Sequence, residues 1–244
     1  MRVHSTIRVM TAAAIGLALS GGATAPASAA TTVHLTFQET LKAGTGVTVR
    51  EVTLDRGTIT DTTGPSGTAA RFPAYVESDS HRAALAVSAT QGRLNPRRED
   101  VVVRADFRLD KVTQGSAYDN GNNILQRGLF GDPAQYKIQV DGRRPACRFK
   151  GSAGSVLVTS PVKVSARTWY RVRCARSGKE MTLRLVALGS GKVWTRSATR
   201  AIGTMSFASG VPLAVGAKLN SQGTIPASSD QFNGRLDNIL VKVG

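Results

Sequence analysis

Apolar and polar residues alternate along most of this chain, and this period of two constrains its fold more than any other feature. In residues 101–110 (VVVRADFRLD) the apolar side chains fall on one face, whereas Arg104, Asp106, Arg108 and Asp110 fall on the other. Successive side chains of a strand point to opposite faces of its sheet. The pattern is therefore typical of a half-buried strand in an antiparallel sheet.

The same alternation recurs in short segments along the whole chain, and no segment has the period of an amphipathic helix. Turn sequences rich in Gly, Pro, Asn and Ser separate these segments. Many short strands at even spacing predict a two-sheet antiparallel jelly-roll β-sandwich, here a single domain over residues 30–244. Strands are expected at 33–37, 47–54, 69–76, 83–88, 101–110, 123–130, 136–141, 146–150, 155–159, 169–174, 181–186, 192–196, 202–207, 211–216 and 234–243.

Residues 1–29 have the pattern of a secretory signal peptide. Arg2 and Arg8 flank the start of the segment, an apolar run covers residues 9–19, and residues 27–29 read Ala-Ser-Ala, an A-x-A cleavage site. The apolar run is shorter than the roughly 20 residues of a transmembrane helix. The sequence therefore predicts a secreted, extracellular protein without a transmembrane anchor, and we expect a monomer.

Two cysteines, Cys147 and Cys174, are present. In an exported chain an even number of cysteines predicts a disulfide. A cysteine-based zinc site would need more ligands than these two thiolates. Cys147 shares the parity of Phe149, and Cys174 shares the parity of Tyr170, so both are expected on the core side of their strands. We therefore predict a structural bridge inside or at the edge of the sandwich.

The closing strand contains a change of parity. Phe232 and Leu236 belong to one alternating set, whereas the apolar residues from Ile239 onward belong to the other. A shift of one residue moves side chains to the opposite face of a sheet, and a β-bulge is the usual way to accommodate it. The sequence predicts a β-bulge at Asp237 and Asn238.

Four motifs in fixed order resemble a known family. They are DNGNNILQRG (119–128), QYKIQ (135–139), TWYRVRC (168–174) and FNGRLDN (232–238). Their order, over residues 100–244, resembles laminin-G-like domains of the concanavalin A-like lectin/glucanase group, in particular the secreted actinobacterial proteins of that type. The resemblance implies a jelly roll whose first and last strands pair, here 33–37 with 236–243. Family members often bind carbohydrate, some bind calcium at a loop rim and some are glycosidases, so the fold does not choose among these functions.

Enzymatic alternatives have incomplete residue sets. A glycosidase needs two carboxylates across the scissile bond, and the E-x-D-x-x-E motif of laminarinase-like relatives is absent from this sequence. A polysaccharide lyase would use residues such as Gln126, Arg127, Tyr136 and Lys137, but the histidine expected on the central strand is missing. Tyr136 also shares its parity with core residues. No catalytic residue is assigned, and a lyase remains a more plausible enzyme than a hydrolase.

One loop offers oxygen atoms for a metal. Calcium prefers carboxylate, amide and carbonyl oxygens, and Asp119, Asn122 and Asp132 provide them in a short stretch. The alternative is an Asx-rich turn in which these side chains bond their own backbone. No other cofactor is expected.

The chain is strongly basic, with 32 Lys and Arg against 16 Asp and Glu and a formal net charge of +16. Such a surplus favours anionic partners, and guanidinium groups pair well with carboxylate and sulfate. We expect non-catalytic binding of an acidic polysaccharide or anionic wall polymer, and no specific nucleic-acid recognition because no reading motif is present. An ordinary polar outer face and an adhesion or protein-interaction module are the alternatives. The candidate ligand-binding residues are Arg104, Arg108, Gln126, Arg127, Lys137, Arg148, Trp169, Arg171 and Arg173.

Overall fold

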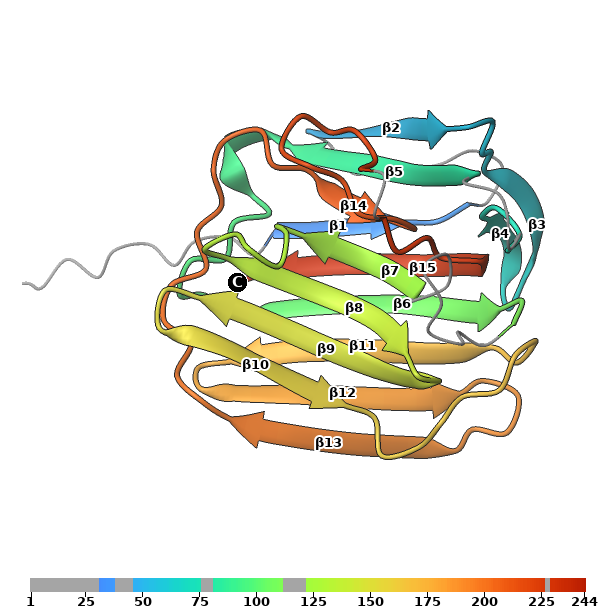
Figure 1. The fold of residues 1–244 in the computed structure, drawn as a ribbon. Coiled ribbons are helices and arrows are strands. Elements are labelled where there is room, and N and C mark those ends of the chain that lie inside the picture. The colour runs from blue at the N-terminus through green and yellow to red at the C-terminus, as the bar shows by residue number, and fades with distance from the viewer. Residues whose placement is uncertain (1–30, 38–45, 76–80, 112–121, 227–228) are drawn as a thin grey trace, which may run out of the picture.

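The protein is a sandwich of two antiparallel β-sheets, which confirms the predicted fold class (Figure 1). The computed structural model describes residues 31–37, 46–75, 81–111, 122–226 and 229–244, so the predicted signal peptide lies outside the described residues. This part of the chain contains no helix that is long and apolar enough to cross a membrane.

The sheet at the back of Figure 1 has eight strands in the order β13-β12-β11-β6-β15-β4-β3, and β1 also pairs with β15. Its strands are β1 (Thr31–Leu35), β3 (Thr60–Gly64), β4 (Gly67–Arg71), β6 (Val101–Leu109), β11 (Tyr170–Ser177), β12 (Glu180–Ala187), β13 (Val193–Thr199) and β15 (Gly234–Val243).

The sheet at the front has seven strands in the order β10-β9-β8-β7-β14-β5-β2. Its strands are β2 (Val47–Leu54), β5 (Arg82–Ala89), β7 (Asn122–Arg127), β8 (Gln135–Asp141), β9 (Arg144–Gly151), β10 (Gly154–Thr159) and β14 (Leu213–Val215). A single 3-10 turn, η1 (Thr90–Gly92), follows β5.

One expected strand is not formed, and one observed strand was not expected. Residues 202–207 are not a strand, and only Met205 forms an isolated bridge, with Arg97. The hairpin strand β3 was not predicted because its sequence, TDTTG, has no apolar member and lies largely exposed at the sheet edge. Alternation detects only strands that bury one face, so an exposed edge strand escapes it.

The core lies between the two sheets and is built from the alternating apolar residues. In β6 the predicted inner residues are all buried, and Phe107 stacks on Tyr170 of β11 with ring centroids 5.7 Å apart. In β8, Tyr136 and Ile138 are fully buried. Burial of Tyr136 raises its pKa to about 12. Burial of apolar surface is the dominant favourable term in folding, so the alternation decides which face of each strand turns inward.

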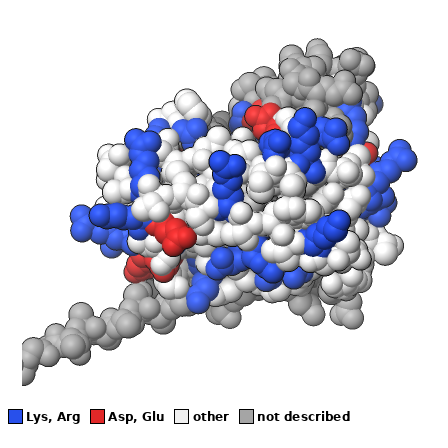
Figure 2. All heavy atoms as spheres, turned by 90° about the horizontal axis from the view of Figure 1, so that it is seen from below, with Lys and Arg blue, Asp and Glu red and all other residues white. Residues whose placement is uncertain are grey.

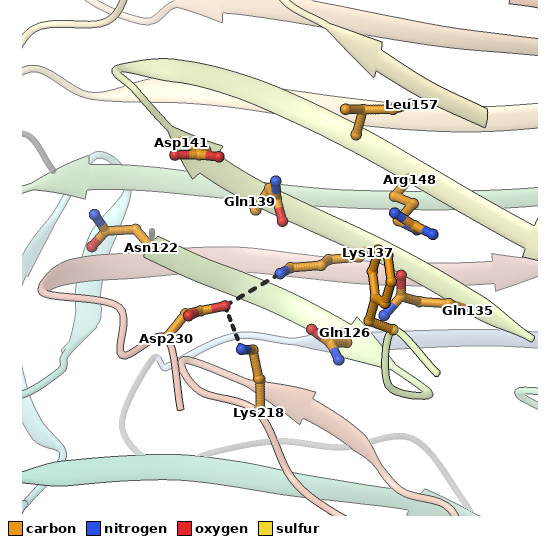
Figure 3. A pocket seen from close by; sticks show the side chains of 11 residues that line it. Asn122, Gln126, Gln135, Lys137, Gln139, Asp141, Arg148, Leu157, Lys218 and Asp230 are labelled. Carbon is orange, nitrogen blue, oxygen red and sulfur yellow. Dashed lines mark ion pairs between the residues drawn. The ribbon is translucent and has the colours of Figure 1, made fainter. Parts of the chain in front are cut away.

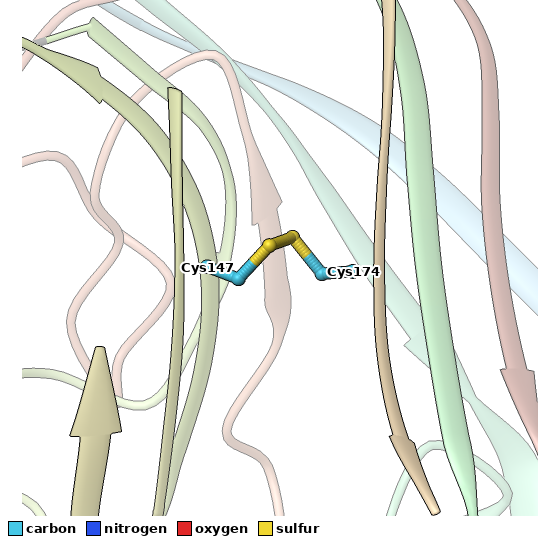
Figure 4. Close-up of a disulfide and its surroundings, with 2 residues drawn as sticks. All are labelled: Cys147 and Cys174. Atoms are coloured by element: carbon cyan, nitrogen blue, oxygen red, sulfur yellow. A yellow bond between two sulfur atoms is a disulfide. The ribbon is translucent and has the colours of Figure 1, made fainter. Parts of the chain in front are cut away.

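The predicted disulfide joins the two sheets across this core (Figure 4). Cys147 of β9 and Cys174 of β11 are fully buried, and their Cα atoms lie 5.7 Å apart. The bridge links residues 27 positions apart in the sequence. It therefore fixes the distance between a strand of the front sheet and a strand of the back sheet.

The closing strand β15 also behaves as predicted. It pairs with β1, with Thr31 opposite Val243 and Leu35 opposite Ile239. Its pairing with β6 shifts register between Asp237 and Leu240, as expected for a β-bulge.

At the bulge Asn238 adopts a φ of 49°, a left-handed value that Asn tolerates better than most residues. The Asn238 amide donates to Asp106 Oδ2 at 2.9 Å. Arg171 binds the same buried carboxylate through two donors, at 2.6 and 2.7 Å. The network compensates the desolvation of Asp106, since a buried charge is tolerated only when paired and hydrogen-bonded.

Reduction of the disulfide should lower the free energy of unfolding by roughly 3–4 kcal/mol, because the cross-link restricts the unfolded chain. Urea unfolding of oxidised and reduced wild-type protein measures this without changing any side-chain volume. The double variant Cys147→Ala/Cys174→Ala should resemble the reduced protein. A difference below about 1 kcal/mol between the oxidised and reduced forms would show that the bridge adds little to the stability of the packed core.

Candidate functional site

A cavity of about 390 Å³ opens on the outer face of the seven-stranded sheet (Figure 3). Its floor is a row of side chains from four adjacent strands. Leu157 of β10 lies opposite Arg148 of β9, Arg148 lies opposite Lys137 of β8, and Lys137 lies opposite Gln126 of β7. These residues face outward because their neighbours along each strand fill the core. The cavity is thus the polar counterpart of the buried inner face.

The chain after β14, which contains Lys218, Ile225 and Asp230, packs on the same sheet and forms one wall of the cavity. Beneath it, alanines of β5 and β14 make a second apolar cluster with Val52, Ala217, Leu219 and Ile225. This packing covers the half of the outer face that lies over β2, β5 and β14, and leaves the half over β7 to β10 open. It also brings Lys218 to the rim of the cavity.

Two lysines share one carboxylate in the cavity (Figure 3). Asp230 Oδ2 lies 2.8 Å from Lys218 Nζ and 3.6 Å from Lys137 Nζ. Lys137 is only 8% exposed, and its burial lowers its pKa to about 8, while the nearby Asp230 carboxylate raises it in part. Arg148 and Asp141 also line the cavity, so its lining has more basic than acidic side chains.

Buried amide side chains hold the floor in place. Gln126 and Gln135 each donate from Nε2 to the carbonyl of Gly128, at 2.7 and 3.0 Å. Asn123 Nδ2 donates to Gln126 Oε1 at 3.0 Å. Gly128 has a φ of 75°, and a Cβ there would meet the carbonyl of Ala134 at 2.1 Å, so the turn requires glycine. The polar groups of the floor are therefore fixed before any ligand arrives.

Phe130 stands at the rim of the cavity with 73% of its surface exposed. The Arg148 guanidinium carbon lies 4.4 Å from its ring centroid, and Lys150 Nζ donates to its carbonyl at 3.0 Å. Asp132 Oδ2 accepts from the amide of Leu129 at 2.7 Å and closes the turn. An exposed aromatic ring beside a polar cavity is a flat apolar platform for a ligand. Sequence reasoning missed Phe130, although a lone aromatic in the turn LFGDP is the signal that marks it.

Of the predicted ligand-binding residues, only Gln126, Lys137 and Arg148 line this cavity. The Arg127 side chain lies on the other face of β7, away from the cavity. Its cross-strand partner on β8 is the core residue Tyr136. Its guanidinium carbon lies 4.5 Å from the ring centroid of Phe207, and its Nε donates to the carbonyl of Val211 at 3.1 Å.

The remaining candidates lie on the other sheet. Arg104 and Arg108 are on β6, Arg171 and Arg173 are on β11, and half-buried Trp169 immediately precedes β11. The structure therefore divides the predicted surface between the two outer faces of the sandwich. The reason is the strand order, which separates β6 and β11 from β8 and β9.

The predicted calcium ligands do not meet in the described part of the chain. Asp119 lies outside the described residues. Asn122 begins β7, where its Oδ1 accepts from the amide of Asn233 at 2.9 Å, and Asp132 lies in the turn beyond the other end of that strand. Both side chains thus bond the protein's own backbone, as the Asx-turn alternative describes for Asp132.

The end of the sandwich where β10 and β13 lie shows the charge surplus directly. Seen from below relative to Figure 1, this side carries many Lys and Arg side chains and few Asp or Glu (Figure 2). The basic residues are spread over the visible surface rather than gathered at one point.

No protein-family model and no curated protein matches this sequence. Solved structures do match. The binding domain of Paraclostridial Mosquitocidal Protein 1 has a TM-score of 0.59 at 12% identity, over 86% of this chain and 47% of that one. Domain 4 of AbnA, a GH43 extracellular arabinanase from Geobacillus stearothermophilus solved in complex with arabinotriose, has a TM-score of 0.56 at 14% identity, over 87% and 91%.

The botulinum neurotoxin serotype C1 binding domain also matches, with a TM-score of 0.56 at 9% identity, over 86% of this chain and 47% of that one. The chain thus spans about half the length of the two toxin chains. At such low identities the likeness concerns the fold alone. The protein has the concanavalin A-like lectin/glucanase fold.

The amine of Lys137 should titrate near pH 8, because burial disfavours its charged form. Asp230→Asn should lower this pKa further, since it removes the carboxylate that stabilises the charged amine. NMR titration of labelled lysine measures both, with the Lys137→Arg spectrum providing the assignment. Asp141→Asn is the control and should have a smaller effect, because Asp141 is the weakest of the contributing charges. An amine that titrates near 10.5 in the wild-type protein would contradict the burial seen here.

Proposed function

We propose that this protein is a secreted, lectin-like domain that binds an extracellular polysaccharide, without catalysis, in the cavity over β7 to β10. The observation that carries the proposal is the exposed Phe130 ring beside a fixed floor of polar side chains. A sugar ring has an apolar face of C–H groups and an edge of hydroxyls, so it needs this combination of an aromatic platform and convergent polar groups.

The charges of the cavity favour a polysaccharide with acidic units. Lys137, Lys218 and Arg148 line it together with Asp230 and Asp141. Cations therefore outnumber acids, and a carboxylate of a uronate would accept charge-assisted hydrogen bonds from them. Anionic wall polymers have the same chemistry and belong to the same proposal.

Further support comes from the fold and the sequence. Domain 4 of AbnA shares the fold and was solved in complex with arabinotriose. The N-terminal segment has the signal-peptide pattern, and a buried disulfide suits an oxidising compartment. The laminin-G-like resemblance of the motifs agrees with an extracellular binding role. We propose that the domain acts as a monomer and has no specific nucleic-acid partner.

A glycan array followed by calorimetry with the strongest ligand tests the proposal. Phe130→Ala should weaken binding about tenfold, which corresponds to about 1.4 kcal/mol, because it removes the platform while leaving the fold intact. Val193→Ala is the matched control, since Val193 is an exposed apolar residue on β13, outside the cavity. Binding that is equally strong in the wild type and Phe130→Ala would refute the cavity as the site, and an array without any signal would refute the function.

A polysaccharide lyase is the second candidate, and the lowered pKa of Lys137 is the observation that favours it. An amine with a pKa of about 8 is partly neutral near physiological pH and can abstract a proton. Tyr136 cannot serve as this base, because it is buried and its pKa is raised. Incubation with uronate polymers should give no rise in ultraviolet absorbance if the protein only binds. Unsaturated product that disappears in Lys137→Met would replace the binding proposal by the lyase.

A further inference from the structure

The outer face of the eight-stranded sheet carries a row of arginines that the cavity does not use. Arg104 of β6 lies opposite Arg173 of β11, and Arg173 lies opposite Arg184 of β12. Neighbouring strands are about 4.8 Å apart, so the row crosses three strands over about 10 Å. Like charges directly opposite each other destabilise a sheet. The row therefore works against the stability of the fold rather than for it.

A second row of arginines on the same face is bound by the protein itself. Arg71 of β4, Arg235 of β15 and Arg108 of β6 are cross-strand partners. Arg71 forms an ion pair with Asp110 at 3.0 Å. Arg235 and Arg108 donate to backbone carbonyls, at 3.2 and 3.0 Å. This row has its partners within the chain.

Among the described residues, the first row has no such ion-pair partners. The buried acids between the rows are Asp106 and Asp237, and Asp106 is already bound by Arg171 and Asn238. Within the described ranges Arg104, like the other two members of its row, forms no ion pair, and Arg104 Nε has no hydrogen-bond partner.

The positive charges around Arg104 affect its pKa. Burial lowers the pKa of Arg104, the neighbouring Arg171 and Arg173 lower it further, and the nearby Asp106 carboxylate raises it in part. Arg184 is exposed and Arg173 is half-buried. The row is thus an accessible line of positive charge that forms no ion pair among the described residues.

We propose that the row formed by Arg104, Arg173 and Arg184 binds a linear polyanionic glycan, with sulfate or carboxylate groups, that runs across the strands. Guanidinium forks match both groups bidentately. A line of three charges on a sheet face fits a repeating polymer better than one small anion. Single-stranded nucleic acid needs aromatic platforms on which its bases stack. The residues that continue the row on either side are Leu240 and Thr195, which provide no such platform.

This surface is separate from the cavity, because the two occupy the outer faces of different sheets. The disulfide and the common core hold the two faces at a fixed distance. One molecule can therefore hold a polyanion on one side and a saccharide on the other, and so link two polymer chains.

Heparin is the probe for the test, by affinity chromatography and by calorimetry at several salt concentrations. The triple variant Arg104→Gln/Arg173→Gln/Arg184→Gln should elute at lower salt and bind about tenfold or more weakly, with a shallower dependence of affinity on salt, because ion contacts determine that slope. The control Arg56→Gln/Arg143→Gln/Lys163→Gln removes three exposed charges elsewhere and should elute close to the wild type. A loss of heparin affinity in Phe130→Ala as large as that in the row variant would place heparin in the cavity and overturn the proposal.

Two further measurements keep the proposal testable if the glutamine variant folds poorly. The triple lysine variant at the same positions retains the charge and should keep most of the affinity. On the wild-type protein, heparin should protect these three arginines from phenylglyoxal, as read by mass spectrometry. Equal losses in the row variant and the control, or unchanged modification of the row, would overturn the proposal. Tighter binding of duplex DNA or of anionic phospholipid vesicles than of heparin at equal salt would overturn the glycan assignment.

Discussion

The alternation of side chains along each strand is the constraint on which the rest of this structure depends. In β8 the same seven residues bury Tyr136 and Ile138 in the core and turn Lys137 outward into the cavity. The core position of one residue therefore dictates the outward position of its neighbour, since strand geometry allows no independent choice. The core therefore keeps the site in place, because a one-residue shift of register would move Tyr136 out of the sandwich and Lys137 into it.

Charged side chains form two networks with little exposure to solvent, one around Asp106 and one around Asp230. Around Asp106 the carboxylate receives donors from Arg171 and Asn238, and the bulge in β15 delivers Asn238 to that point. In the cavity, one carboxylate, that of Asp230, serves both Lys137 and Lys218. The first network is close to balanced and supports the fold. The second lies in a cavity lined by more basic than acidic side chains, which favours recognition of an anionic group.

The two faces of the sandwich differ in shape as well as charge. On the seven-stranded sheet, the chain after β14 covers β2, β5 and β14 and forms a wall of the cavity beside them. On the eight-stranded sheet, arginines stand in register across neighbouring strands. A cavity with an aromatic rim suits one sugar unit or a few, whereas a row of cations suits a polymer with regularly spaced charges. Saccharide binding in the cavity and polyanion binding on the arginine row thus rest on different physical features and can be tested separately.

Local sequence was enough to predict most of the strands, the inward or outward parity of Lys137, Arg148 and Arg173, the disulfide and the bulge at Asn238. Each of these follows from the local period of two or from the count of cysteines. Which outward residues become neighbours depends instead on how the strands are arranged in space. Arg104 meets Arg173 because β6 pairs with β11, and Lys137 meets Asp230 because a distant loop packs on the sheet. Strand order and loop packing are non-local, set by the burial of whole sheets, and no short stretch of sequence records them.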